Sequence, residues 1–311
     1  MKFLQELTPQ SLQGAIDLIT KTTDHDGIPP VSEHVLLHLR HGGDKNDRHI
    51  VVEDGGKIVG YAHLDLTDQV EGPSTELLID PAYRSQGLGS ELLREVEKIA
   101  GDRLRLWAHG DLPGSQKLAK KAGFERIRTV AQMRRTLTEA LPEITIPIRT
   151  FKVGSDEKEW LALNNRAFIN HPDQGKWSER DLEIRKQEDW FDPQGFFIAE
   201  VDQKMSGFCW VKIHGGKAHS HAHSHSNSES QDPTDLHGHD PIGEIYVMGV
   251  DPALHGRGIG RAVVLAGLCY MRNKGIFSAM LYVEADNRDA IKLYTKVGFT
   301  AWGRDILYRK N

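Results

Sequence analysis

A glycine-rich segment of the chain carries the residue types best suited to bind an anion. Its sequence is Val250-Asp-Pro-Ala-Leu-His-Gly-Arg-Gly-Ile-Gly-Arg261, and an apolar, helix-like stretch follows it. Glycines let the backbone come close to a ligand, and the start of a helix offers unpaired N–H groups and a favourable dipole for phosphate. The segment therefore indicates binding of a phosphate or pyrophosphate. A tight turn without a ligand is the alternative.

A weaker copy of this segment lies in the first half of the chain. It reads Ile79-Asp-Pro-Ala-Tyr-Arg-Ser-Gln-Gly-Leu-Gly-Ser90. In both copies an apolar run reaches Asp-Pro, and a turn of the type Q/R-x-x-G-x-G then opens an apolar, helix-like segment. The chain is therefore predicted to contain the same phosphate-binding fold twice.

The repeat extends to the elements that must position these turns. Each half has a serine-capped helix start, at Ser32 and Ser178, followed by two apolar strands. Each half then has the glycine turn, a helix, a further strand, and a last helix that ends in a glycine and leads into a final strand. The predicted elements cover residues 49–52, 58–66, 91–99, 103–108 and 115–124 in the first half, and 195–201, 207–213, 262–274, 279–284 and 290–299 in the second.

This order predicts an α/β protein of two tandem domains, each a mixed, mostly antiparallel sheet flanked by helices on both faces. We expect the first domain to cover residues 1–140 and the second to cover residues 141–311, with the boundary near residues 138–143. The segment from Leu141 to Ile148 is the expected linker.

A Ser/His-rich run over residues 217–240 lies outside the repeat. Its composition cannot support a packed core, so we expect a mobile loop between two strands. The run contains six spaced histidines, which suggest metal binding: His219, His221, His223, His225, His237 and His239. Because no cysteine or carboxylate cluster completes a site, we favour a solvated loop that binds Ni²⁺ or Zn²⁺ only in vitro, and we expect no metal cofactor.

Composition excludes several classes of protein. The 311 residues are 39% apolar and 27% charged with a formal net charge of −5, and no basic stripe suggests a nucleic-acid partner. The N-terminus lacks the apolar run of a signal peptide, and no window approaches about 18 apolar residues, so a membrane protein is not expected. Cys209 and Cys269 lie in apolar surroundings and are interpreted as core residues of a protein in a reducing compartment. We expect a cytoplasmic protein.

The order of motifs resembles one known superfamily. An apolar strand, Val-Asp-Pro, His-Gly-Arg-Gly-Ile-Gly, Glu284-Ala-Asp-Asn287 and Lys292-Leu-Tyr-Thr-Lys-Val-Gly-Phe299 are together similar to the GCN5-related N-acetyltransferase (GNAT) superfamily. The resemblance implies that acetyl-CoA is held by its pyrophosphate at the glycine turn. It also implies that a free amine attacks the thioester directly, without a covalent enzyme intermediate.

The tandem arrangement of the two domains points to one family within this superfamily. Four further motifs contribute to it: His171-Pro-Asp-Gln-Gly175, Trp190-Phe-Asp-Pro193, Phe208-Cys-Trp-Val-Lys212 and Gly243-Glu-Ile-Tyr-Val-Met-Gly-Val-Asp-Pro252. Together they resemble the mycothiol synthase family over essentially the whole chain except the histidine run. The resemblance implies acetyl transfer from acetyl-CoA to the cysteinyl amine of desacetylmycothiol (Cys-GlcN-Ins), which gives mycothiol and CoA in the last step of mycothiol biosynthesis. We expect a monomer that acts on small molecules, with neither nucleic acid nor membrane as a partner.

The same resemblance assigns two proton-handling residues. An α-amino group has a pKa near 8 and is mostly protonated at pH 7, so a base helps the attack. Glu244 matches the proposed base of the family, and Tyr294 matches the usual general acid that protonates the leaving thiolate. The alternatives are a solvent-facing strand carboxylate and a core tyrosine. Counting from the shared motifs, the first half has Pro73 opposite Glu244 and Ala119 opposite Tyr294, so only the second half is expected to catalyse.

The cofactor contacts follow from the same match. Backbone groups of the motif strand should pair with the pantetheine arm, beside a bulge that splays the strands, and the glycine turn should hold the pyrophosphate. The predicted contacts in the second half are Met248, Gly249, Val250, His255, Gly256, Arg257, Gly258, Ile259, Gly260, Arg261, Asn287, Arg288, Asp289, Ala290, Ile291 and Lys292. Those in the first half are Leu77, Leu78, Ile79, Arg84, Ser85, Gln86, Gly87, Leu88 and Gly89, where a vestigial domain without ligand is the alternative.

The acceptor is a polyol with a cationic amine, so acidic and hydrogen-bonding residues should converge on it. The matching positions are Glu33, Asp173, Lys212, Glu244 and Tyr282, and we expect the acceptor in the cleft between the halves. Asp173 stands where relatives usually carry Glu. Glu33 has the alternative of an early-helix acid favoured by the dipole, and Lys212 that of an exposed strand end.

Two other functions stay open at this point. One is acetylation of a different amine: a protein N-terminus, a polyamine or an aminoglycoside. The other is a non-catalytic protein, either an acyl-CoA sensor or a metal store that uses the histidine run.

Overall fold

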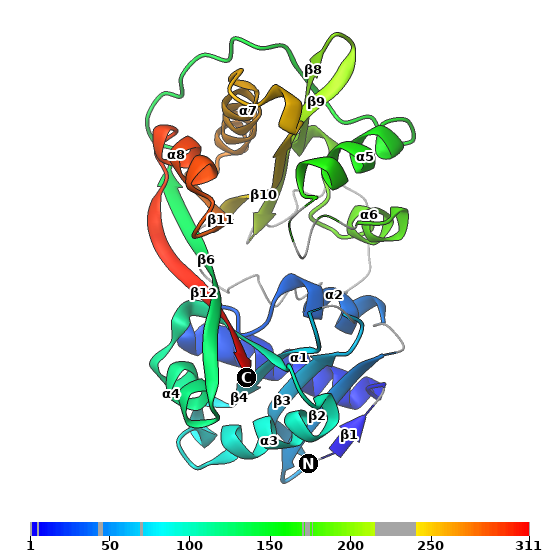
Figure 1. Cartoon of the computed structure of the whole chain (residues 1–311), viewed down its shortest axis with the longest axis vertical. Helices are drawn as coiled ribbons and strands as arrows, with labels where there is room; N and C mark the ends of the chain where they lie inside the picture. The colour runs from blue at the N-terminus through cyan, green and yellow to red at the C-terminus, as the bar shows by residue number, and fades with distance from the viewer. Residues whose placement is uncertain are drawn as a thin grey trace, which may run out of the picture. The chain divides into compact units, whose positions relative to one another are not determined.

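A computed structural model of the chain describes residues 2–4, 6–42, 46–68, 71–169, 171, 175, 177–214 and 241–310 (Figure 1). Asp173 and the Ser/His-rich run lie outside the described residues. The described chain divides into two compact units, each with its own contacts. The first unit takes the residues up to Ala131 and those from Gly303 onward, and the second takes those from Gln132 to Trp302.

The first unit begins with a short strand and two helices, and then alternates strands with helices. Its elements are β1 (Lys2–Leu4), α1 (Pro9–Asp26), α2 (Glu33–His41), β2 (Asp47–Asp54), β3 (Lys57–Asp65), β4 (Ser74–Ile79), α3 (Leu88–Ala100), β5 (Arg105–Ala108) and α4 (Pro113–Lys121). Single 3-10 turns, η1 (Pro81–Tyr83) and η2 (His109–Asp111), follow β4 and β5.

The second unit repeats this order. Its elements are β7 (Ile148–Thr150), α5 (Glu157–Ala167), α6 (Glu179–Lys186), η3 (Pro193–Gly195), β8 (Phe196–Val201), β9 (Lys204–His214), β10 (Ile242–Val250), η4 (Pro252–Leu254), α7 (Ile259–Asn273), β11 (Ser278–Glu284) and α8 (Arg288–Lys296). Two long strands, β6 (Phe124–Thr136) and β12 (Thr300–Lys310), give residues to both units.

The sheets have the predicted mixed character. The strand order is β1-β2-β3-β4-β5-β12 for the first unit and β6-β11-β10-β9-β8-β7 for the second. β4 runs parallel to β5 and β10 runs parallel to β11, whereas hairpin pairs such as β3–β4 and β9–β10 are antiparallel. The C-terminal strand β12 pairs with β5 through Ile306 to Arg309, so the end of the chain completes the first sheet, a feature that the sequence prediction did not include.

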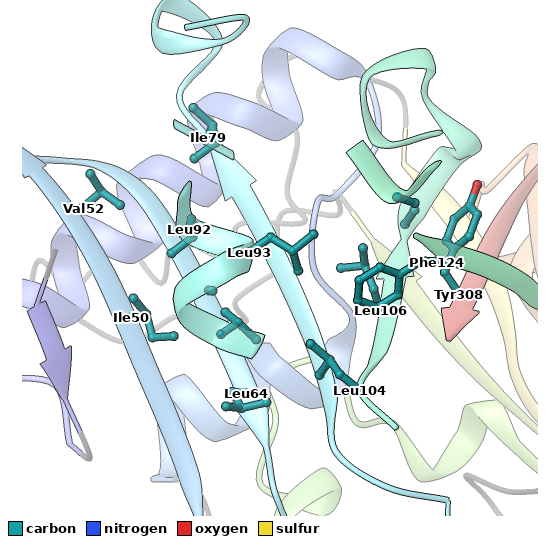
Figure 2. Close-up of a cluster of buried hydrophobic side chains, with 14 of the residues drawn as sticks. Ile50, Val52, Leu64, Ile79, Leu92, Leu93, Leu104, Leu106, Phe124 and Tyr308 are labelled. Carbon is teal, nitrogen blue, oxygen red and sulfur yellow. The ribbon is translucent and has the colours of Figure 1, made fainter. Parts of the chain in front are cut away.

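Alternation along β2 shows how helices cover both faces of the first sheet. Ile50 packs in one cluster with Leu92 of α3 (Figure 2), and its neighbour Val51 packs on the opposite face with Leu18 of α1 and Val35 of α2. Successive side chains of a strand point to opposite faces, so an apolar strand of this kind needs cover on both. The prediction of helices on both faces is confirmed for this unit.

Truncation of this core should destabilise the protein. Leu92 is completely buried, so Leu92→Ala removes methyl groups from a packed cluster and is expected to lower the free energy of unfolding by about 2–5 kcal/mol. Ile99 lies on the same helix with 37% of its surface exposed, and Ile99→Ala should cost less than about 1 kcal/mol. Urea denaturation of both variants checks the difference, and equal losses would contradict the placement of this cluster.

The second sheet is covered in the same way. Phe208 and Trp210 of β9 pack with Trp160 of α5, while the intervening Cys209 faces α7, where its sulfur comes close to the backbone at Gly267. Both cysteines are free thiols. Cys209 is buried as predicted, but Cys269 is only half-buried, so its assignment to the core was wrong. None of the described helices is both long and apolar enough to cross a membrane.

Candidate active site

The strands of the second unit separate where the sequence predicts the pantetheine arm. β10 pairs with β11 from Ile242 to Ile245, yet both strands continue, β10 to Val250 and β11 to Glu284. The register between β10 and β9 shifts between Ile245 and Val247, which is the expected bulge. Beyond it, the pairing partners of Met248 and Val250 among the described residues all belong to β9. A strand edge of this kind is suited to pair with an extended amide chain.

The glycine turn after β10 has the geometry of an anion cradle. Gly256 and Gly258 both adopt left-handed conformations, with φ of 80° at each, and α7 begins directly at Ile259. Alternation of this kind turns successive N–H groups toward one concavity at the positive end of a helix dipole. The corresponding turn of the first unit has Ser85 at φ 62° and Gly87 at φ 92°. The two turns are therefore alike in backbone.

The Asp-Pro motif fixes the place of each turn. Asp251 accepts a hydrogen bond from the backbone N–H of Ala253 at 3.1 Å and from Arg166 of α5 at 3.0 Å. In the first unit, Asp80 accepts from the N–H of Ala82 at 3.0 Å and from Lys21 of α1 at 2.7 Å. In both units, a cation on a helix therefore holds the motif aspartate, which in turn caps the 3-10 turn ahead of the glycines.

Glu244 lies on β10 just before the strands separate. Its carboxylate is 2.7 Å from Nε2 of His214, and its side chain is 12% exposed, so the alternative of a solvent-facing carboxylate is wrong. Lys212 is directly opposite on β9 and is 5% exposed, which also excludes the alternative of an exposed strand end. The Lys212 ammonium lies 4.9 Å from the centre of the Trp190 ring. A carboxylate, an imidazole and an ammonium thus gather on one face of the sheet.

Tyr282 belongs to the same face, two residues beyond the partner of Glu244 on β11. It is 40% exposed, and its hydroxyl accepts a hydrogen bond from Gln132 at 2.9 Å. Glu284, two residues further along, lies 3.6 Å from His171, the first residue of the His-Pro-Asp-Gln motif. The predicted contact Asp173 in that motif lies outside the described residues.

Tyr294 is the single buried residue of α8, as Ala119 is of α4. Both are the seventh residue of a nine-residue helix, which supports the alignment of the two halves. Burial raises the pKa of Tyr294 well above its usual range, so the hydroxyl stays protonated at neutral pH. The ring contacts Phe299, as a core tyrosine would. A protonated hydroxyl on the helix that follows the separated strands also suits an acid.

The bulge changes which residue of the first unit corresponds to Glu244. Counting back from Asp-Pro places Pro73 opposite Glu244, but β4 pairs with β3 from Ser74 to Ile79 without any shift of register. The bulge in β10 adds one residue that β4 lacks, so the cross-strand pairs match Glu244 with Ser74. Serine is not a carboxylate, so the first unit has no base at the position of Glu244.

A buried ionic network lies where β4 separates from β5 in the first unit. The last described pair is Thr75 with Leu106, and the next residue, Glu76, accepts hydrogen bonds from the backbone and hydroxyl of Ser32 at 2.5 and 2.7 Å. His109, which follows β5, lies 3.3 Å from Glu76 and 3.1 Å from Asp305 of β12. Ser32 precedes α2 as predicted, but its hydroxyl binds Glu76 rather than capping the helix.

This network predicts a pH-dependent stability. Burial opposes the charge on His109, but Asp305 and Glu76 outweigh it and raise the pKa of His109 from 6.5 to about 10. Burial likewise opposes ionisation of Glu76, but His109 and Ser32 lower its pKa from 4.5 to about 2. The stabilisation by His109 is therefore complete below about pH 6.5 and is lost as the pH rises toward 10, and that by Glu76 is lost as the pH falls from 4.5 toward 2.

We expect His109→Gln to lower the free energy of unfolding by about 1.5–3 kcal/mol at pH 6. The difference from the unsubstituted chain should shrink steadily between pH 6.5 and 10, because the unfolded chain releases this proton above about pH 6.5 whereas the native protein keeps it up to about pH 10, so that rising pH favours unfolding. Urea denaturation at several pH values measures it, with the exposed His25→Gln as control. A difference that grows with pH would contradict the assignment of charge.

The other residues predicted to bind the acceptor or the cofactor lie partly in the first unit and partly in the second. Glu33 is the first residue of α2 and belongs to the first unit, unlike the other acceptor candidates. Asn287 caps α8 by accepting from the N–H of Ala290, so the predicted contacts from Asn287 to Lys292 form the first turn of that helix. Arg84 of the first glycine turn is held by Asp26 in a two-point ion pair at 2.8 and 2.6 Å.

Comparison with known families agrees with this architecture. The model of the acetyltransferase (GNAT) family matches residues 17–124 and 158–299, one stretch in each half of the chain. The chain belongs to the GNAT family. As a member it is an acyltransferase, and the family implies acetyl-CoA as its co-substrate.

Relatives within the family are similar along the whole chain. The mycothiol acetyltransferase of Acidothermus cellulolyticus is 47% identical, with 98% of this chain and 92% of the relative covered. The mycothiol acetyltransferase of Streptosporangium roseum is 42% identical, with 98% and 97% covered. Among solved structures, a tandem GNAT protein from the clavulanic acid biosynthesis pathway has a TM-score of 0.69 at 18% identity, covering 99% and 97%. That likeness shows a shared tandem GNAT fold.

Two residues of this GNAT site were missed by sequence reasoning. His214 contacts Glu244, and Arg166 holds Asp251. Lys21 and Arg166 each lie on the first helix of their unit, and this repeated pattern of cations could have been found by aligning the two halves. His214 had no such signal, because it pairs with Ile242 and reaches the Glu244 carboxylate only in the register that β9 and β10 adopt.

Proposed function

We propose that this GNAT protein transfers the acetyl group of acetyl-CoA to the cysteinyl amine of desacetylmycothiol, forming mycothiol and CoA. Relatives named mycothiol acetyltransferase that align along nearly the full chain support the choice of acceptor. The observation that carries the proposed chemistry is the largely covered Glu244 carboxylate beside His214, at the point where β10 separates from β11.

In the proposed reaction the amine nitrogen attacks the thioester carbonyl. The base, Glu244, takes a proton from that nitrogen, and the contact with His214 orients the carboxylate. When the tetrahedral species collapses, the carbon–sulfur bond breaks and the thiolate of CoA takes the proton of Tyr294. The chain returns to its starting state once Glu244 loses its proton to solvent and Tyr294 regains one.

Binding of acetyl-CoA is assigned to the separated strands and the glycine turn. The free edge of β10 at Met248 to Val250 would pair with the pantetheine amides, and the N–H groups from His255 to Arg261 would hold the pyrophosphate. The first turn of α8 borders the same region in this proposal. The first unit keeps the same turn, but its Arg84 is already paired with Asp26, so we expect weaker binding of the phosphates there.

The acceptor is assigned to the face of the second unit that carries Lys212, Glu244 and Tyr282. Asp173 and Glu33 stay predicted contacts from the family resemblance. Burial of Lys212 beside Glu244 favours this assignment, because charged side chains of opposite sign can satisfy the hydroxyl and amine groups of an amino-sugar conjugate. A pocket built for such groups should discriminate strongly against amines that lack them.

A CoA-release assay tests the proposal. The purified chain is supplied with acetyl-CoA and, in separate reactions, with desacetylmycothiol, a polyamine, an aminoglycoside and a peptide with a free N-terminus. We expect kcat/KM for desacetylmycothiol to exceed the others by at least about 10²-fold. A different preferred amine would replace the acceptor assignment, and no turnover with any amine would favour a non-catalytic acyl-CoA-binding protein.

A further inference from the structure

A cluster of histidines and aspartates lies on one face of the β2–β3 hairpin in the first unit. Asp47 pairs with Asp65 and His49 pairs with His63 across the two strands, so these four side chains share a face. α2 packs on that face, and its residues His34 and His38, one turn apart, are directed toward the strands, with His38 in contact with Asp47. Figure 1 marks α2, β2 and β3.

Three of these residues bring donor atoms to a common point. One atom from each of His38, Asp47 and His63 lies within 4.8 Å of the other two. Nδ1 of His38 is 2.6 Å from Oδ2 of Asp47, and Nε2 of His63 is 3.7 Å from the same oxygen. Ligand atoms around a tetrahedral zinc lie about 3.3 Å apart, given bonds of about 2.0–2.2 Å, so small side-chain rotations would suffice.

The His63 nitrogen gives an independent indication of a ligand. Its side chain is 2% exposed, and Nε2 is buried with no hydrogen bond in the described part of the chain. Leaving a buried polar nitrogen without a partner costs about 1–3 kcal/mol. The atom is directed toward Asp47 but is too far away for a hydrogen bond. A cation held beside Asp47 would give the His63 nitrogen a partner.

We propose that His38, Asp47 and His63 bind a zinc ion, with water in the fourth position. Two imidazole nitrogens and one carboxylate oxygen form a donor set that zinc accepts in proteins. The ion would join α2 to the β2–β3 hairpin and so stabilise the first unit. The sequence predicted no metal ligands in this chain. That prediction concerned the histidines of the Ser/His-rich run, and the proposed site lies outside that run.

Comparison of the two units supports a separate role for this face. The cross-strand pairs match His63 with Trp210 and Asp65 with Lys212. In the second unit these positions belong to the face assigned to the acceptor. In the first unit the same face carries imidazoles and carboxylates, and a metal site would account for this change of chemistry without requiring catalysis there.

The test uses the full-length chain and cobalt as a spectroscopic probe for zinc. The six histidines of the Ser/His-rich run are replaced by glutamine to remove competing ligands, and Co²⁺ is titrated while its visible absorption is recorded. We expect one Co²⁺ per chain with the strong bands of four-coordinate cobalt, which Zn²⁺ then displaces. In this background, His63→Gln and the more exposed His38→Gln should each weaken binding at least tenfold.

The matched control is His25→Gln, a surface histidine of α1 in the same unit, which should bind Co²⁺ within twofold of the background chain. Thermal unfolding gives a second reading, because an ion that binds only the folded chain raises Tm, and tighter binding raises it further. Zn²⁺ should raise Tm for the control and not for His38→Gln. Absence of a cobalt band in the background chain, or equal binding by His38→Gln and the control, would overturn the proposal.

Discussion

Replacing Glu244 by glutamine is expected to lower kcat of acetyl transfer by about 10²- to 10⁴-fold at pH 7. Glutamine keeps the size of the side chain and can still contact His214, which lies 2.7 Å from the carboxylate. It cannot accept the proton of the attacking amine. The KM for acetyl-CoA should change little, because the assigned cofactor contacts lie further along β10 and in the glycine turn.

The pH profile separates loss of the base from structural damage. Without an enzymic base, the amine must lose its proton to solvent before it attacks, so the rate of Glu244→Gln should keep rising with pH toward the amine pKa near 8. The control is Glu179→Gln, an exposed carboxylate at the start of α6, which should retain full activity. Activity of Glu244→Gln within threefold of the unsubstituted chain would remove Glu244 from the base role.

Replacing Tyr294 by phenylalanine is expected to lower kcat by about 10²-fold or more, with the dissociation constant of acetyl-CoA changed less than twofold. The ring keeps its contact with Phe299, and only the hydroxyl is lost. Because burial raises the pKa of Tyr294, this hydroxyl is a protonated donor over the whole neutral range. Steady-state kinetics and calorimetric titration together measure the two effects.

Tyr270→Phe provides the matched control for this variant. The Tyr270 hydroxyl donates a hydrogen bond to Asp192 at 2.6 Å, so its loss should lower Tm while leaving turnover intact. Tyr294→Phe should show the opposite pattern. Unchanged turnover in Tyr294→Phe would mean that the leaving thiolate takes its proton elsewhere and that this tyrosine only fills the core.

Features with a local signal were predicted correctly from the sequence. Gly256 and Gly258 in the glycine turn of the second unit predict left-handed conformations, and the spacing of the apolar residues after them predicts α7. Ser178 forms the full capping box that its position before an acidic residue suggests. These features need only the neighbouring residues, because the φ values and hydrogen bonds involved lie within one turn of helix.

The family resemblance implied the bulge itself, but the contacts that follow from the register between strands were not predicted. A single bulged residue in β10 shifts the counterpart of Glu244 from Pro73 to Ser74, and the register between β9 and β10 places His214 beside the carboxylate. A single extra residue cannot be recognised from the alternation of side chains in a strand whose residues are almost all apolar. The Ser32 hydroxyl is another example, because its partner Glu76 is 44 residues away.

The histidine cluster shows the same difficulty. Its donors come from α2, β2 and β3, at spacings that match no metal-binding motif. In the sequence, only the six histidines of the Ser/His-rich run suggested metal binding. Only the pairing of β2 with β3, and the packing of α2 on that face, bring His38, Asp47 and His63 together.

The asymmetry between the two units can be tested most directly with one pair of substitutions. Gly87 and Gly258 both precede the motif helix in left-handed conformations, and an added side chain meets nothing closer than 4.0 Å at either. Aspartate tolerates this conformation and favours helix starts, so both variants should fold. Its carboxylate would, however, repel a pyrophosphate held at the turn.

The measurement is mycothiol formation from acetyl-CoA and desacetylmycothiol by the Gly258→Asp and Gly87→Asp variants, with Tm recorded for each. We predict that Gly258→Asp loses acetyl transfer, with a raised KM for acetyl-CoA, while Gly87→Asp keeps the activity of the unsubstituted chain. Loss of activity in Gly87→Asp together with full activity in Gly258→Asp would contradict this prediction and would place the chemistry in the first unit.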